Sequence, residues 1–150
     1  MTQAYTNRFT EVEELPVGWL TPDTRAAGVY TTGYISLANH QRASFILLVG
    51  DMAAGATVDL QLWEATDAAG TGAQAIVGKA ITQLTQAGGD GDDAVIVELR
   101  TEELDVDAGY AFVAAIVTIA GGNVDSALLP LLGCSNYPPV SVANWTEIVD

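Results

Sequence analysis

Residues 44–100 read SFILLVGDMAAGATVDLQLWEATDAAGTGAQAIVGKAITQLTQAGGDGDDAVIVELR, and this stretch decides the fold class. Short runs with β-strand character are separated in it by loops of Gly, Ala and Asp. In the clearest run, residues 57–64, Val58, Leu60 and Leu62 alternate with residues suited to an outer face. A period of two is typical of a strand with one buried face. The stretch therefore predicts several short strands, and it holds no catalytic set.

Further strands are predicted on both sides of this run, bounded by turn-prone Gly, Asn and Asp residues. They cover about residues 28–37, 43–49, 79–86, 95–100, 110–120 and 125–134. Residues 66–78 are small and glycine-rich, which favours a loop. Ile81 and Leu84 also fit the spacing of a helix. Pro130, inside the last run, predicts an edge position or a break in that strand.

Seven or eight short strands without a long amphipathic helix predict an all-β fold, a jelly-roll-like β-sandwich. The length of 150 residues fits a single domain, with its core over about residues 28–134. The flanking segments, residues 1–27 and 135–150, contain prolines and only scattered apolar residues. We expect them to form extended N- and C-terminal arms.

The charge of the chain excludes several classes of partner. Five Lys and Arg stand against 19 Asp and Glu, a formal net charge of −14. Such a chain repels nucleic acid and anionic lipid surfaces. The N-terminus lacks the pattern of a signal peptide, and the longest apolar run, residues 110–120, is too short to span a bilayer as a helix. We therefore expect a protein made in a cytoplasm, with neither nucleic acid nor membrane as partner.

No residue pattern points to catalysis, a cofactor or a metal. His40 is the only histidine and lies in the turn-prone sequence Asn-His-Gln-Arg, where a solvated turn residue is expected. Cys134 is the only cysteine and follows a leucine-rich run, so a small buried apolar residue is expected. Asp90, Asp92 and Asp93 lack the spacing of an EF-hand loop and predict an ordinary acidic turn. We expect no enzymatic activity.

Three tryptophans are the candidate contact residues. Trp63 lies on the polar side of its predicted strand, where it either anchors a partner or is covered by a loop or arm of the same chain. Trp19 and Trp145 lie in the predicted N- and C-terminal arms.

Residues 47–119 resemble a group of small proteins encoded among the structural genes of tailed bacteriophages. The matching elements are GDMAAGATVDLQLWEATDAAG (50–70), GKAITQLTQAGGD (78–90) and LDVDAGYAFVAAIVTI (104–119). These proteins resemble capsid cement, or decoration, proteins with a jelly-roll-like sandwich. Roughly half to two-thirds of the chain takes part in the resemblance, and none of the three elements is a catalytic fingerprint.

The resemblance implies a structural virion protein that binds the outside of a capsid and bridges its subunits. It also implies the major capsid protein as partner, and we expect a homo-oligomer, a dimer or a trimer. Three alternatives stay open at this point: another virion component such as a tail or head-completion protein, a carbohydrate-binding sandwich, and an enzyme.

Overall fold

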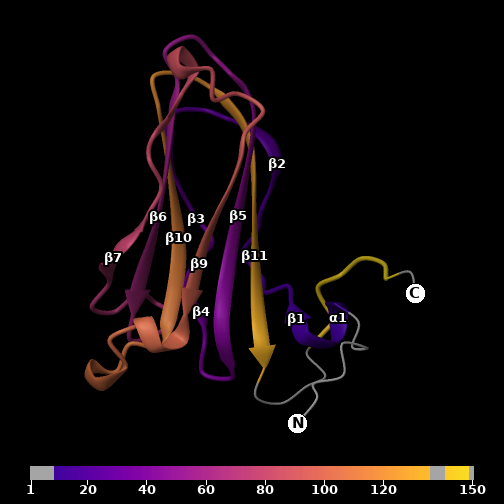
Figure 1. Ribbon diagram of the computed structural model, residues 1–150, viewed down its shortest axis with the longest axis vertical. Helices are drawn as coiled ribbons and strands as arrows, with labels where there is room; N and C mark the ends of the chain where they lie inside the picture. Colours follow the sequence, from indigo (N-terminus) through magenta and orange to yellow (C-terminus); the bar gives the residue numbers. More distant parts are fainter. Residues whose placement is uncertain (1–8, 136–140, 149–150) are drawn as a thin grey trace.

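The computed structural model describes residues 9–135 and 141–148, apart from the side chain of Cys134. Two antiparallel β-sheets pack face to face along the whole length of the molecule (Figure 1). The predicted all-β sandwich is thereby confirmed. Within the described residues, no helix is long and apolar enough to cross a membrane.

The first sheet, sheet A, has the strand order β1-β11-β5-β9, with β2 also paired to β11. Its strands are β1 (Glu13–Glu14), β2 (Leu20–Arg25), β5 (His40–Met52), β9 (Ala94–Arg100) and β11 (Val124–Ser135). The second sheet, sheet B, has the order β3-β10-β6-β7, with β4 paired to β10 and β8 paired to β6. Its strands are β3 (Gly28–Thr31), β4 (Ile35–Ser36), β6 (Thr57–Ala65), β7 (Gln74–Ala80), β8 (Leu84–Thr85) and β10 (Phe112–Ala120).

The described residues form four short helices outside the sheets: α1 (Phe9–Val12) and the 3-10 helices η1 (Gln86–Gly88), η2 (Thr101–Glu103) and η3 (Val106–Ala108). From β2 onward, the chain crosses between the sheets at each connection, except within the β3–β4 and β6–β7–β8 segments, which stay in sheet B. This order places most hydrogen-bonded neighbours far apart in the chain. It leaves β9 at one border of sheet A, on the same side of the sandwich as β7 and β8.

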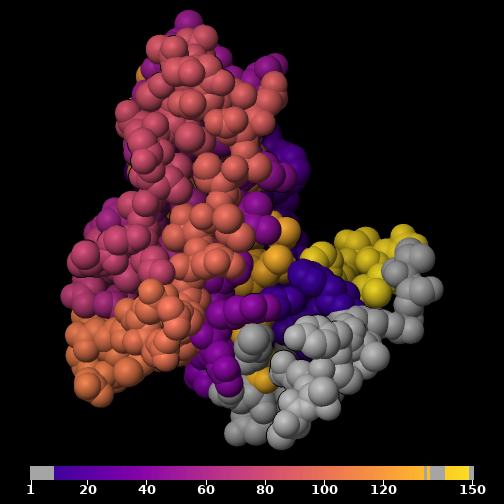
Figure 2. All heavy atoms as spheres, in the orientation of Figure 1, coloured from indigo at the N-terminus to yellow at the C-terminus, as the bar shows by residue number. Residues whose placement is uncertain are grey.

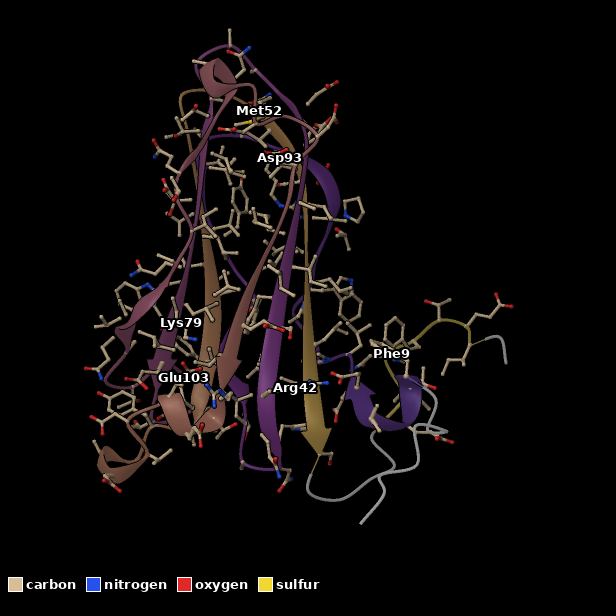
Figure 3. The ribbon with its side chains drawn as sticks, in the orientation of Figure 1. Phe9, Arg42, Met52, Lys79, Asp93 and Glu103 are labelled. Carbon is tan, nitrogen blue, oxygen red and sulfur yellow. The ribbon has the colours of Figure 1, made fainter. Side chains whose placement is uncertain are left out.

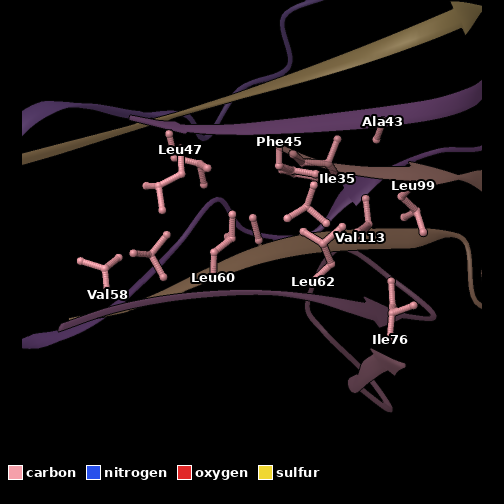
Figure 4. Packing of buried hydrophobic residues seen from close by; sticks show 14 of the residues in the cluster. Ile35, Ala43, Phe45, Leu47, Val58, Leu60, Leu62, Ile76, Leu99 and Val113 are labelled. Carbon is pink, nitrogen blue, oxygen red and sulfur yellow. The ribbon is translucent and has the colours of Figure 1, made fainter. Parts of the chain in front are cut away.

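The core lies between the two sheets and follows the period-two pattern of the strands. Phe45 and Leu47 of β5 are fully buried and face Leu60 and Leu62 of β6 across the sandwich (Figure 4). Val113 of β10 joins the same cluster. Burying such side chains contributes about 1.5–3 kcal/mol each. The alternation predicted for residues 57–64 is the alternation observed in β6.

Two strand predictions can be compared with the structure, and the first of them needs correction. Residues 66–78 were expected to form a loop, but β7 already begins at Gln74 and ends at Ala80, and only Leu84 and Thr85 follow as a second short strand. Pro130 does not interrupt β11. On one side β11 pairs with β5 along its length, while on the other side β2 reaches Leu128 and β1 begins only at Leu132. Pro130 therefore lies between two strand partners, at a place where the ladder on that side is open.

Part of the expected N-terminal arm, residues 13–14 and 20–25, forms strands of sheet A. β1 and β2 both pair with β11 and complete the border of the sheet opposite β9. Leu15 is only 5% exposed. The segment is extended, as expected, but backbone pairing with β11 attaches it to the sandwich. Residues 141–148, in the expected C-terminal arm, contain no strand or helix.

Candidate contact surfaces

The described part of the chain carries four cationic side chains, and each binds groups of the same chain. Arg25 is buried, donates hydrogen bonds to the carbonyl oxygens of Thr21 and Ser126, and lies 5.6 Å from the ring centre of Tyr30. The other three form ion pairs: Arg42 with Glu13, Lys79 with Glu103, and Arg100 with Glu102. Because the cations are bound within the chain, the remaining carboxylates give the surface an acidic character.

The outer face of sheet A carries a group of apolar side chains. Alternate residues of β5 are buried in the core, so the residues between them point outward. The register places Ile46 between Ile96 and Leu129, and Leu48 between the two alanines of the group. Leu48 is 49% exposed and Ile96 is 55% exposed. We call six residues the sheet A patch: Ile46 and Leu48 of β5, Ala94 and Ile96 of β9, and Ala127 and Leu129 of β11.

Carboxylates border the sheet A patch. A hollow of about 490 Å³ adjoins Leu48 and is lined by Asp23 of β2 and Asp125 of β11, among others. Thr24 binds both carboxylates. Its backbone N–H donates a hydrogen bond to Asp23, and its hydroxyl donates one to Asp125. The patch thus combines an apolar centre with an acidic rim, and a complementary partner would combine apolar and basic groups.

Trp63 lies on the outer face of sheet B, since its neighbours Leu62 and Glu64 in β6 are buried. It is half-buried, and the small residues Ala114 and Ala75 lie directly beside it on the adjoining strands. Both readings of Trp63, as an anchor and as a covered residue, stay open.

Trp19 and Trp145 are likewise half-buried, but they lie in other parts of the molecule. Trp19 directly precedes β2. Trp145 follows Asn144, whose side chain donates a hydrogen bond to the carbonyl oxygen of Leu15. The indole N–H of Trp145 is buried and has no hydrogen-bond partner among the described residues. The three tryptophans therefore lie in three separate parts of the chain and remain candidates for separate contacts.

His40 is not the solvated turn residue that we expected. It begins β5, is 8% exposed, and its Nε2 lies 3.2 Å from a carboxylate oxygen of Glu14 in β1. The contact lacks the direction of a hydrogen bond, and both ring nitrogens are buried. A hollow of about 620 Å³ adjoins His40 and is also lined by Arg42 and Arg100. The ring nitrogens of His40 are buried, so they are not accessible to a molecule bound in this hollow. The burial follows from β1, which the sequence pattern did not reveal.

In the acidic turn at residues 90–93, the Asp90 carboxylate binds the end of the nearby strand β8. Asp90 accepts hydrogen bonds from the backbone N–H and hydroxyl of Thr85, at 2.7 and 3.5 Å. No three His, Cys, Asp or Glu side chains in the described part of the chain are grouped to hold a metal ion.

Two other carboxyls have lowered pKa values. Hydrogen bonds from Thr71, through its side chain and then its backbone, lower the pKa of Asp67. A hydrogen bond from the backbone N–H of Arg100, followed by contact with Lys79, lowers the pKa of Glu103. Lys79 also donates to the carbonyl oxygen of Glu98 at 2.8 Å, so it joins β7 of sheet B to β9 of sheet A (Figure 3).

The sequence reasoning missed the sheet A patch, although a signal for it was present. Residues 43–49 are apolar at every position but one, and we took both faces of that strand to be buried. In β9, Ile96 is the large apolar residue among outward positions that otherwise hold Ala, Glu and Arg. Apolar residues at outward positions of two strands predict a contact surface once those strands are known to be neighbours.

No protein-family model matches the sequence, and neither does any curated protein.

Proposed function

We propose that the protein is a structural component of a tailed-bacteriophage particle, a cement protein that binds the outside of the capsid. It would be made in the host cytoplasm and would bind the major capsid protein, stabilising the shell by bridging neighbouring subunits. The resemblance of residues 47–119 to virion proteins supports this role. The sheet A patch adds a surface through which such a protein could attach.

The observation that carries the proposal is the patch itself. Monomeric soluble proteins rarely expose contiguous apolar patches larger than a few hundred Å², and larger ones mark interaction sites. Two residues of the patch are about half exposed: Leu48 lies on the central strand β5, and Ile96 lies on the border strand β9. Burial of apolar area contributes about 25 cal/mol per Å², and many equivalent sites on one shell multiply modest contacts.

The acidic surface of the protein limits the kinds of contact that could attach it to a capsid. Neighbouring copies with a net charge of −14 repel one another over about 8 Å at physiological salt. Apolar contact at the patch should therefore provide most of the attachment, unless the capsid presents a basic surface to the acidic rim. Binding through apolar area persists in high salt, whereas binding through opposite charges weakens.

The experiment measures the copies of protein bound per particle, using capsids prepared without it and a series of salt concentrations. Leu48→Ser removes apolar area from the patch at an exposed position and should lower occupancy several-fold at every salt concentration. Val77→Ser is the matched control, because Val77 is 96% exposed but lies on β7 of sheet B. It should bind like the wild type.

Trp19→Ala, Trp63→Ala and Trp145→Ala, measured in the same assay, identify any tryptophan that adds to the contact. A wild-type protein that does not bind capsids overturns the proposal. Equal binding of the wild type and Leu48→Ser, with complete release by salt, would show attachment by charge and overturn the role of the patch.

A further inference from the structure

Strand β9 is the border of sheet A on the side away from β1 and β2. Among the described residues it pairs with β5 alone. Figure 2 shows atoms of β9 at the surface of this side, with those of β7 to the left. Unpaired border strands expose backbone donors and acceptors to which another strand can add.

Two contacts identify which backbone groups of β9 point away from β5. The carbonyl oxygen of Glu98 accepts from Lys79, and the backbone N–H of Arg100 donates to Glu103 at 2.7 Å. Because the N–H and C=O of one strand residue point to the same side, and alternate residues share a side, the backbone groups of Ala94 and Ile96 also point outward. The free border of β9 thus presents the groups of Ala94, Ile96 and Glu98.

A hollow lies beside this border. A groove of about 550 Å³ runs between β9 and the segment around β8, and it is lined by Ile81, Leu84, Val95 and Val97, among others. Lys79 occupies one end of the groove through its bond to the Glu98 carbonyl. A carbonyl oxygen has two lone pairs, so Lys79 and an incoming backbone N–H can bind it together.

We propose that β9 pairs with β9 of a second copy of the chain, antiparallel and about a two-fold axis at Ile96. In this register Glu98 lies opposite Ala94 of the other copy, and Ile96 lies opposite Ile96 at the axis. No carboxylate faces a carboxylate at these positions, and an apolar side chain meets its own copy at the axis, so the strand is complementary to itself. Pairing about a two-fold axis requires this self-complementarity.

The dimer joins two sheet A patches into one surface. Ile96 lies beside Ile46, which in turn lies beside Leu129. Pairing at Ile96 extends this apolar row across the axis into the second copy, on the same face of a continuous sheet. A surface of two patches would bind a repetitive partner with higher avidity than one. The dimer itself is a property of the isolated protein and does not depend on the proposed capsid role.

Sedimentation velocity of the purified full-length chain, from micromolar to near-millimolar concentration, tests the dimer. The wild type should dimerise, and more strongly as salt rises, because salt screens the repulsion between two acidic copies. Ile96→Lys places two like charges opposite each other at the axis, and Ile96→Pro removes an outward N–H without touching the ladder to β5. Each should raise the dimer dissociation constant at least about tenfold.

Val29→Lys is the control, since it makes the same charge change at a 68% exposed position of β3 in sheet B. It should dimerise at least as well as the wild type, because it reduces the net negative charge. Circular dichroism verifies the fold of each variant, and Ile96→Lys alone suffices if the proline variant does not fold. A wild-type protein that stays monomeric at every protein and salt concentration overturns the proposal. So does an Ile96→Lys variant that forms oligomers as readily as the wild type.

Discussion

At the scale of single residues, two glycines show how closely the loops at one end of the sandwich approach each other. Gly121, in the turn between β10 and β11, has a φ of +76°, and Gly55, in the turn before β6, has a φ of +79°. A Cβ added at Gly121 would overlap the carbonyl oxygen of Gly55, whereas a Cβ at Gly55 would meet no atom within 4 Å. The two positions therefore share a left-handed backbone but differ in the space around it.

Alanine at these positions should separate the two effects. Gly55→Ala should cost about 1–2 kcal/mol of stability, the penalty for a left-handed residue with a Cβ. Gly121→Ala should cost about 1–3 kcal/mol more, because a neighbouring turn must move. Denaturant unfolding of both variants measures the difference. Equal losses would contradict the close approach of the two turns.

Glu103 provides a test of pH dependence. The pKa of Glu103 in the folded protein lies below its ordinary value of 4.5, chiefly because of the hydrogen bond from the Arg100 N–H and then because of Lys79. The ionised form therefore stabilises the fold above pH 4.5, and this stabilisation is lost as the pH falls through the lower folded pKa. Glu103→Gln should destabilise the protein at pH 7 and have a smaller effect at pH 3, as measured by denaturant unfolding at each pH.

Glu102→Gln is the control for that experiment. Glu102 pairs with Arg100 at the surface, where both side chains are more than 70% exposed, and such pairs contribute little. A loss in Glu103→Gln that is the same at both pH values would show that the carboxylate charge is not the stabilising feature.

At the scale of elements, the segment before β2 decides how the border of sheet A is completed. Leu15 follows β1 and is 5% exposed, while Val17, two residues on, is 68% exposed. Leu15→Ala should lower the free energy of unfolding by about 2–5 kcal/mol. Val17→Ala should change it by less than about 0.5 kcal/mol. Thermal or denaturant unfolding compares them, and a negligible loss in Leu15→Ala would mean that this segment is a dispensable arm.

The strands that the sequence predicted well are those whose burial alternates along the chain. β6 and β10 each pair on both sides and bury every second residue, so their periodicity is visible without a structure. β2 was missed because four of its six residues are exposed, and pairing with β11 rather than core packing holds it in place. β7 was missed because its small residues and Gly78 read as a loop. A strand that is held by backbone hydrogen bonds alone need not show alternating apolar residues in its sequence.

The same limit applied to the candidate site. Trp63 was correctly placed on the outward face, because that inference needs only the alternation within one strand. The sheet A patch depends on which strands are neighbours, and β5, β9 and β11 are far apart in the chain. The burial of His40 depends on Glu14 of β1, a contact between distant segments. The periodicity of the sequence predicted which face of a strand each residue occupies, but it did not predict which strands are neighbours in a sheet.

At the scale of the whole molecule, a strongly acidic sandwich carries an apolar surface on one sheet and a free strand border beside it. The described cations are bound internally, so the charge favours solubility and repulsion between copies, while the patch favours contact. We propose that the apolar surface of sheet A binds the outside of a capsid.

Cryo-electron microscopy of particles that contain the protein tests this proposal. We expect density for the sandwich at repeated positions on the outside of the shell, bridging neighbouring capsid subunits, with Leu48 and Leu129 of sheet A turned toward the capsid protein. Particles whose outer surface lacks this density, or a sandwich located in the tail, would contradict it.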